Sequence, residues 1–200
     1  YALQQKLPFL TLVHQGDVLK HTEGAFKRWG YELAQQEFSA VVDEQSGNML
    51  ITDDAGHQLV VKDVLTDTML QALLLEPQEH SVVASLNRSG AYLADALAAQ
   101  VGGIGISPGA NVSDSVALFE ATHGTAACHA GLDKMNPSSL ILAAAMMLRH
   151  LGWNEAAALI IDAINATTKS QMAEFDSEQL INSAKTVSTT AFGERVIALM

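Results

Sequence analysis

The sequence is poor in cysteine, in basic residues and in long apolar runs, and each shortage argues against a class of protein. Its 200 residues include one cysteine, Cys128, so no disulfide can form within the chain, and a reducing, cytoplasmic setting is expected. Lysine and arginine total 11 against 22 aspartates and glutamates, a formal net charge of −11. A nucleic-acid partner is not expected, because clustered basic side chains bind phosphate backbones. The apolar run Leu140–Leu148 ends at Arg149 and His150, so no membrane span is expected.

What the sequence does contain is typical of a globular α/β protein. Hydrophobic residues make up 48% of the chain and aromatic residues 6%, and the length suffices for one domain or for pieces of two. The first residues, Tyr1 to Lys6, include no initiator methionine, no basic segment and no signal-peptide core. They are typical of the last turn of a helix, so we expect the chain to be a fragment of a longer polypeptide.

Short apolar runs alternate with segments in which apolar residues recur every three or four positions, which predicts alternating strands and helices. The predicted strands are Phe9–Val13, Val41-Val42, Met49–Ile51, Leu59–Val61, Ser81–Leu86 and a short strand at Leu118–Ala121. The predicted helices follow Thr22 as far as Phe38 and span residues 63–75, 92–101, 138–151, 154–168, 177–185 and 191–199, with Asp176 and Thr189 as N-caps of the last two. This alternation favours an α/β fold with a mainly parallel sheet flanked by helices.

A change in composition near Gly102 predicts a boundary between two subdomains. Residues 102–113 are rich in small side chains and are expected to form a flexible connection. The run Gly103-Ile104-Gly105 is a weak dinucleotide signal, because the third glycine of that fingerprint is replaced by Pro108.

The segment Thr122–Ala126, with Asn136 and Pro137 further on, is the most informative part of the chain. A strand is expected before it, and a helix is expected after it with Asn136 as N-cap and Pro137 as its first residue. Backbone N–H groups in such a loop can hold a phosphate or a purine edge. An ordinary connection between a strand and a helix is the alternative.

Three groups of motifs give the chain a family resemblance. They are Leu12-Val13-His14-Gln15-Gly16-Asp17 with Thr22-Glu23-Gly24-Ala25-Phe26, Val61-Lys62-Asp63-Val64 with Asp95 through Ile106, and Phe119 through Ala126 with Met146-Met147-Leu148-Arg149-His150. Together they resemble the C-terminal half of a bacterial NADP-type isocitrate dehydrogenase, in the isocitrate/isopropylmalate dehydrogenase family. Sister enzymes acting on isopropylmalate, homoisocitrate or tartrate are the runner-up, and the Met-Met-Leu-Arg-His run favours isocitrate.

The resemblance implies an organisation and a chemistry. Residues 1–101 would belong to a small domain that carries the dimer contacts and the metal site, and residues 102–200 to a nucleotide-binding domain. A homodimer would form through the helices at 63–75 and 92–101. The family oxidises a tricarboxylic or dicarboxylic 2-hydroxy acid with NAD(P) and releases CO₂ with the help of Mg²⁺ or Mn²⁺.

The resemblance also assigns roles to individual residues. It places Asp67 and Asp95 at the metal, with Asp67 also in the catalytic group. The residues implied at the adenine nucleotide are His123, Gly124, Thr125, Ala126 and Asn136.

Several positions depart from the family pattern. Gln15 stands where the family has a proton-transferring lysine, and Ala91 stands where it has a metal-binding aspartate. Cys128 and His129 replace the lysine and tyrosine that meet the 2′-phosphate of NADP, and Phe175 and Gln179 replace a second tyrosine and an arginine of that site. We therefore expect impaired or absent activity in this chain, and the alternative is a non-catalytic relative that serves as a dimerising regulatory or interaction subunit.

Overall fold

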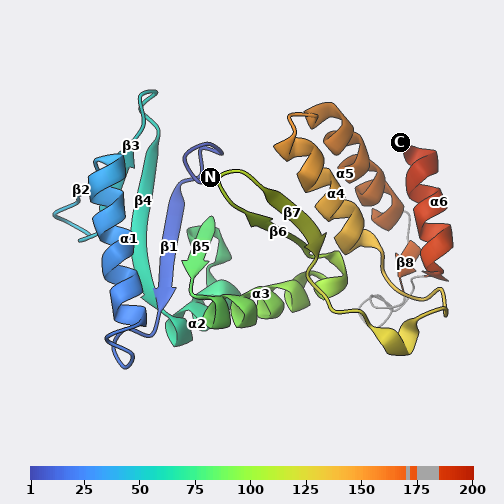
Figure 1. Cartoon of the computed structure of the whole chain (residues 1–200), viewed down its shortest axis with the longest axis horizontal. Coiled ribbons are helices and arrows are strands. Elements are labelled where there is room, and N and C mark those ends of the chain that lie inside the picture. Colours follow the sequence, from blue (N-terminus) through green and yellow to red (C-terminus); the bar gives the residue numbers. More distant parts are fainter. Residues whose placement is uncertain (170–171, 175–184) are drawn as a thin grey trace. The chain divides into compact units, whose positions relative to one another are not determined.

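The computed structural model describes residues 1–169, 172–174 and 185–200, in two compact units, Tyr1–Ala94 and Asp95–Met200 (Figure 1). The division after Ala94 lies inside a helix, and the assignment of residues 1–101 and 102–200 to a small and a large domain stays a prediction. The proposed helix at 177–185, except for its last residue, and the candidate cap Asp176 lie outside the described residues, as do Phe175 and Gln179.

The first unit is built on a five-stranded sheet with the order β2-β3-β4-β1-β5. β1 is parallel to β4 on one side and to β5 on the other, whereas β2/β3 and β3/β4 are antiparallel. Its elements are β1 (Phe9–His14), α1 (Glu23–Phe38), β2 (Val41–Val42), β3 (Met49–Thr52), β4 (Gln58–Leu65), α2 (Thr66–Leu75), the 3₁₀ turn η1 (Pro77–Glu79) and β5 (Val82–Ser85), and α3 (Asn87–Val101) crosses into the second unit. The predicted α/β fold with a mainly parallel sheet and flanking helices is confirmed.

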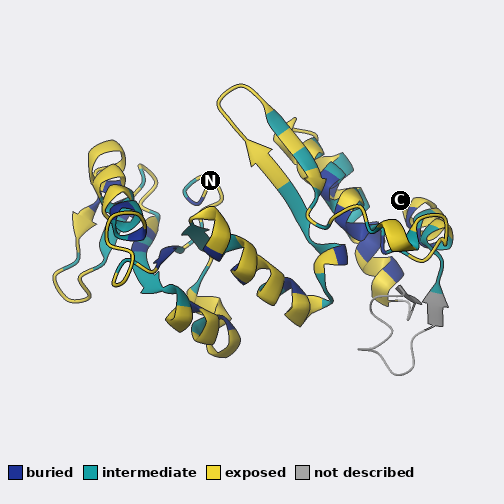
Figure 2. Cartoon of the chain, turned by 60° about the horizontal axis from the view of Figure 1, so that its bottom comes forward, coloured by how far each residue is buried: buried dark blue, intermediate teal, exposed yellow. Residues whose placement is uncertain are grey.

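β1 forms the core of the first unit because it lies between two parallel neighbours. Its last four residues are all buried (Figure 2), the pattern of a central strand rather than the alternation of an edge strand. α1 packs closely on this strand at Gly30, where an added Cβ would lie 2.6 Å from Leu12 Cδ1. The cluster of buried apolar side chains beneath α1 comprises Ala2, Leu12, Ala34, Ala40, Ile51, Leu59 and Val61.

Two helices of the first unit begin at residues other than those expected. The helix expected from Asp63 begins at Thr66, because β4 continues as far as Leu65 in register with His14 of β1. Parallel pairing along the β-branched run therefore outweighed the helical spacing of the same residues. α3 begins at Asn87 instead of Tyr92, so it includes Gly90, which the predicted range 92–101 had left outside the helix.

The second unit contains, in its described part, two small sheets, the end of α3 and three complete α-helices. β6 and β7 form an antiparallel hairpin, and β8 and β9 form a parallel pair. Its elements are the 3₁₀ turn η2 (Ile104–Ile106), β6 (Pro108–Val112), β7 (Ala117–Ala121), the 3₁₀ turn η3 (Ala127–His129), α4 (Ser138–His150), α5 (Asn154–Lys169), β8 (Met172–Glu174), β9 (Lys185–Val187) and α6 (Thr189–Leu199). The prediction of a flexible connection at 102–113 was wrong, because residues 108–112 form β6 and pair with β7. Lys185, expected at the end of a helix, begins β9.

Small side chains allow the helices of the second unit to pack closely. The buried residues of α4 and α5 are mostly alanine, serine and threonine, and α6 contributes Phe192, which is 1% exposed, together with Val196. The N-cap of α6 is Ser188, whose hydroxyl accepts from the Ala191 N–H, so Thr189 is the first helical residue and not the cap. Among the described residues, no helix is long and apolar enough to cross a membrane.

Replacing Phe192 should destabilise the second unit selectively. Phe192→Ala empties a fully buried ring site, and we expect the free energy of unfolding to fall by about 3–5 kcal/mol. The chain has two tryptophans, Trp29 in the first unit and Trp153 in the second. Urea unfolding followed by Trp153 fluorescence in a Trp29→Phe background would measure the change. Ile197→Ala, on the same helix but 73% exposed, is the matched control, and equal losses for the two variants would contradict the assignment of the core.

Candidate functional site

The three parallel strands of the first unit end at one edge of the sheet. Their register places His14 beside Leu65 and Val13 beside Ser85. Gln15 follows β1 directly, and Asp67 lies in the first turn of α2, just after β4. Two residues singled out in the sequence therefore lie at the carboxyl edge of the parallel strands, where open α/β sheets bind their ligands.

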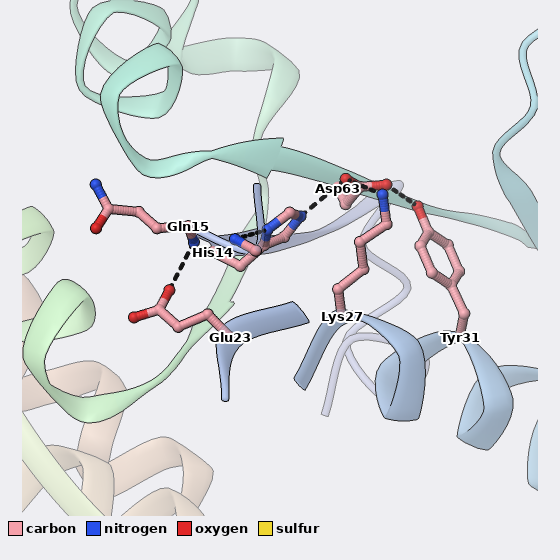
Figure 3. Close-up of polar contacts among 7 residues, drawn as sticks. His14, Gln15, Glu23, Lys27, Tyr31 and Asp63 are labelled. Carbon is pink, nitrogen blue, oxygen red and sulfur yellow. Dashed lines mark hydrogen bonds and ion pairs between the residues drawn. The ribbon is translucent and has the colours of Figure 1, made fainter. Parts of the chain in front are cut away.

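His14 is the buried end of β1, and its ring is held on both sides. The Gly16 N–H donates to His14 Nδ1 at 2.9 Å, and His14 Nε2 lies 2.9 Å from Asp63 Oδ2 (Figure 3). Because Nδ1 accepts a hydrogen bond, we assign the ring proton to Nε2, which donates it to the Asp63 carboxylate. The ring is thus fixed in one tautomer and one orientation.

Asp63 collects two further partners from α1. Lys27 Nζ lies 2.8 Å from Oδ2, and the Tyr31 hydroxyl donates to Oδ1 at 2.7 Å. Burial alone would raise the pKa of Asp63, but the hydrogen bonds from Lys27, Tyr31 and His14 outweigh it and lower that pKa below its ordinary value. Burial, together with the bond to the Asp63 charge, raises the pKa of Tyr31. The carboxylate is ionised at neutral pH, and the phenol keeps its proton.

The backbone at Gln15 is held while its side chain is exposed. The Gln15 N–H donates to Glu23 Oε2 at 2.6 Å, and Glu23 is buried at the start of α1. An added Cβ at Gly16 would lie 2.7 Å from Gly24 Cα, so this turn needs glycine to pass α1 so closely. Figure 3 shows the Gln15 amide extending away from Asp63. The backbone of residue 15 is thus held in place, and its side chain, that of glutamine, does not titrate.

The residues expected at the metal are exposed and lie in different units. The Asp67 carboxylate accepts from the Thr68 N–H at 2.9 Å, and Asp95 lies on the part of α3 that belongs to the second unit. Ala91, also exposed, offers only a methyl group. Within residues 1–169, 172–174 and 185–200, no three His, Cys, Asp or Glu side chains form a group that could hold a metal ion. The described residues of one chain therefore do not by themselves fit Mg²⁺ or Mn²⁺, and the roles of Asp67 and Asp95 stay predictions.

In the second unit, the loop that follows β7 is open to solvent at its middle. His123 is half-buried and its Nδ1 lies 2.9 Å from the Gly124 carbonyl oxygen, whereas Gly124 and Thr125 are exposed. An added Cβ at Gly124 would meet no other heavy atom within 4 Å. Ala126 turns the chain with φ of +45°, in the left-handed region. The loop thus presents backbone to solvent with free space beside it.

The buried side chain of Asn136 bonds the end of this loop to the start of α4. Its Oδ1 accepts from the Ser138 N–H at 2.8 Å, so the side chain satisfies the first N–H group of α4 although Asn136 is not the N-cap that was predicted. The helix begins at Ser138, the first residue of the predicted range 138–151, and its N-cap is Pro137, so the predictions of Asn136 as N-cap and of Pro137 as the first helical residue were wrong by one position. Cys128, in η3 between Ala126 and Asn136, is exposed.

The sequence predictions missed the group around Asp63. His14 and Asp63 were noticed only as parts of motifs, and Asp63 was assigned to a helix. The signal that could have found the group is the spacing of Lys27 and Tyr31, four residues apart on α1 and therefore on one face of it. Which partner that face meets depends on the register of β4 against β1.

These features describe an α/β protein with candidate ligand groups at its strand-to-helix connections. The chain belongs to the isocitrate/isopropylmalate dehydrogenase family, whose model matches residues 1–196. It is 53% identical to the NADP isocitrate dehydrogenase of Pseudomonas aeruginosa and 52% identical to that of Coxiella burnetii, over 100% and 98% of this chain and 48% and 46% of those proteins. The crystal structure of isocitrate dehydrogenase from Methylococcus capsulatus matches with a TM-score of 0.82 at 29% identity, over all of this chain and 52% of that one. The chain spans about half the length of the curated relatives it matches.

Removing the Asp63 charge should change how stability depends on pH. The lowered pKa means that the ionised carboxylate stabilises the fold above its ordinary pKa of about 3.9, and that this contribution is lost as the pH falls through the lower folded-state value. Asp63→Asn should reduce the free energy of unfolding by about 1–3 kcal/mol at pH 7, and the gap to the wild type should close below about pH 4.

Urea unfolding of the chain at pH 7, 5, 4 and 3 measures this gap. Asp54→Asn, in the exposed turn between β3 and β4, removes the same charge without these partners and serves as the control. A gap for Asp63→Asn that is constant across these pH values would contradict the ionised state assigned to Asp63.

Proposed function

We propose that this chain is part of an isocitrate dehydrogenase that keeps an adenine-nucleotide site but lacks side chains needed for efficient turnover. The observation that carries the proposal is the loop after β7, which leaves the backbone of Gly124 open and ends on the buried Asn136, whose Oδ1 accepts from the Ser138 N–H. Family membership and the NADP-dependent relatives support the same ligand class.

The nucleotide would be held by backbone and small side chains. Gly124 and Thr125 form the exposed part of the loop between the half-buried His123 and Ala126, and Asn136 holds its end against α4. Glycine at the exposed position lets a ligand approach the main chain more closely than any other residue would. Bound here, NAD(P) would supply the hydride acceptor of the reaction, and the role of these residues is to bind and orient it.

We further propose that the chain does not prefer NADP over NAD. A 2′-phosphate is selected by Lys or Arg side chains that form charged hydrogen bonds to its oxygens. Cys128 and His129 occupy the positions at which the family resemblance implies a lysine and a tyrosine. The exposed thiol of Cys128 is a weak donor and offers the phosphate little.

The substrate side of the site is impaired at two positions. Gln15 can hydrogen-bond an isocitrate oxygen but cannot exchange a proton near neutral pH. Ala91 removes one carboxylate from the group that the family resemblance assigns to Mg²⁺ or Mn²⁺, leaving Asp67 and Asp95. General acid–base assistance contributes roughly 10²–10⁴-fold to a rate, so the change at residue 15 alone should be severe.

Nucleotide binding tests the central part of this proposal. Gly124→Ala should fit within the chain itself but place a methyl group against the ligand, so we expect its Kd for NAD⁺ to rise about tenfold, equivalent to about 1.4 kcal/mol. NAD⁺ and NADP⁺ should bind the wild-type chain with Kd values within about threefold of each other. Isothermal titration calorimetry measures both.

Gly193→Ala is the matched control for that measurement. Gly193 lies in α6, and an added Cβ there also meets no heavy atom within 4 Å. Alanine is the better helix former, so this variant should be as stable as the wild type or slightly more stable, with unchanged nucleotide affinity. Equal affinities of all three proteins would contradict the placement of the nucleotide at Gly124.

Catalysis provides a separate test. We expect no measurable oxidation of isocitrate by this chain with Mg²⁺ and either nucleotide, followed by NAD(P)H absorbance. In a full-length protein that carries this sequence, Gln15→Lys with Ala91→Asp should raise kcat by at least about 10²-fold. Turnover at ordinary rates by the unaltered chain would overturn the impaired-site proposal.

A second function is favoured by the exposed apolar residues of α2 and α3. Leu74 and Leu75 of α2 are 66% and 67% exposed, and Tyr92 of α3 is 63% exposed. Burying such side chains contributes about 1.5–3 kcal/mol each, enough to support a homodimer through these helices. A dimer that binds nucleotide but gains no turnover when residues 15 and 91 are restored would identify a non-catalytic regulatory or interaction subunit.

A further inference from the structure

The N-terminus of α6 is bonded directly to the loop that carries the candidate nucleotide residues. The Asp133 Oδ1 accepts from the Thr190 N–H at 2.9 Å and from the Thr190 hydroxyl at 2.8 Å. The Asp133 carbonyl oxygen accepts from the Thr189 N–H at 3.1 Å, and the Thr189 hydroxyl donates to the Met135 carbonyl oxygen. Two consecutive residues of α6 therefore hold two positions of the loop that are more than fifty residues away in sequence.

Asp133 has a backbone conformation that needs such support. Its φ is +54°, in the left-handed region that residues other than glycine rarely occupy. Aspartate and asparagine are the side chains that enter this region most readily. The bonds from α6 use both the side chain and the carbonyl of Asp133, so they hold the residue in this conformation.

The position of the Asp133 carboxylate at the N-terminus of α6 also favours its ionised form. The Thr190 N–H, the Thr190 hydroxyl and then the Ser188 hydroxyl lower the pKa of Asp133 below its ordinary value. An ionised carboxylate at the first turn of a helix is favoured by the N–H groups that point out of it. The charge thus adds to the geometric constraint at neutral pH.

α6 is a firm support because its other face is buried. Phe192 and Val196 pack with Ala163 and Ile164 of α5 in the core of the second unit. The near end of the loop is held separately, where the Thr122 hydroxyl donates to the Ser107 carbonyl oxygen at 2.9 Å. Between these two anchors lie the exposed Gly124 and Thr125 and the half-buried, left-handed Ala126 of the candidate nucleotide site.

We propose that Asp133 is a positioning residue that holds the nucleotide loop of residues 122–136 in its binding conformation by tying it to α6. The inference about nucleotide affinity rests on the function proposed above, and the inference about the loop itself does not. Asp133 would touch no ligand; it would act by keeping the backbone of Gly124 and Thr125 where the ligand meets it.

Hydrogen exchange of the loop amides tests the positioning directly. The amides of His129, Ala130 and Leu132 bond to carbonyls within the loop at 2.9, 3.2 and 3.1 Å and so report its opening. Asp133→Ala removes the side-chain bonds to α6, and we expect these three amides to exchange about tenfold faster, with the Kd for NAD⁺ about tenfold higher. Asp133→Asn keeps an acceptor oxygen and the left-handed conformation, and should restore both values to within about threefold of the wild type.

Asp162→Ala is the control, because Asp162 is an exposed residue of α5 and the substitution removes the same charge. If Asp133→Ala does not fold, Thr190→Val removes only the hydroxyl donor and should accelerate exchange about threefold. The proposal would be overturned if the loop amides exchanged at the same rate in Asp133→Ala as in Asp162→Ala. The same criterion applies to Thr190→Val where that variant is used instead. A wild-type chain that binds neither nucleotide would refute the proposed function alone, and the exchange data would still decide the role of Asp133.

Discussion

The first unit depends on the parallel pairing of β1 with β4. This register places Leu12 beside Asp63 and His14 beside Leu65, so the buried histidine at the end of β1 comes within reach of a carboxylate on the neighbouring strand. Once Asp63 is fixed there, Lys27 and Tyr31 of α1 supply the donors that keep it ionised in a half-buried position. A shift of one residue would turn Asp63 to the other face of the sheet and leave these donors without their acceptor.

In the second unit, an exposed loop is held in place by hydrogen bonds instead of by burial. The loop after β7 is anchored near its start by Thr122, at its end by the buried Asn136, and through Asp133 by α6. Its left-handed positions, Ala126 and Asp133, cost free energy that isolated loops rarely sustain. Anchors on rigid elements allow the exposed middle to keep one conformation, which is the condition for binding a ligand without a large loss of entropy.

Elements that depend on local sequence patterns were predicted well, whereas those that depend on contacts between residues distant in sequence were not. Strand and helix positions were predicted well where the pattern was local, as in α1, α4 and the buried run of β1. The boundary between β4 and α2 was wrong because Asp63 and Val64 satisfy a helical spacing, and only the pairing with β1 shows that they belong to a strand. Likewise, residues 108–112 are rich in small side chains and were expected to be a loop, but β7 supplies hydrogen-bond partners for them.

The sequence by itself determined the family, the alternation of strands and helices, and the identity of the side chains at residues 15, 91, 128 and 129. These depend on residue type and order, which no folding step alters. Only the tertiary structure decided that His14, Lys27 and Tyr31 meet on Asp63, and that Asp133 ties the loop after β7 to α6. Such contacts join residues tens of positions apart, and strand register and helix packing bring them together.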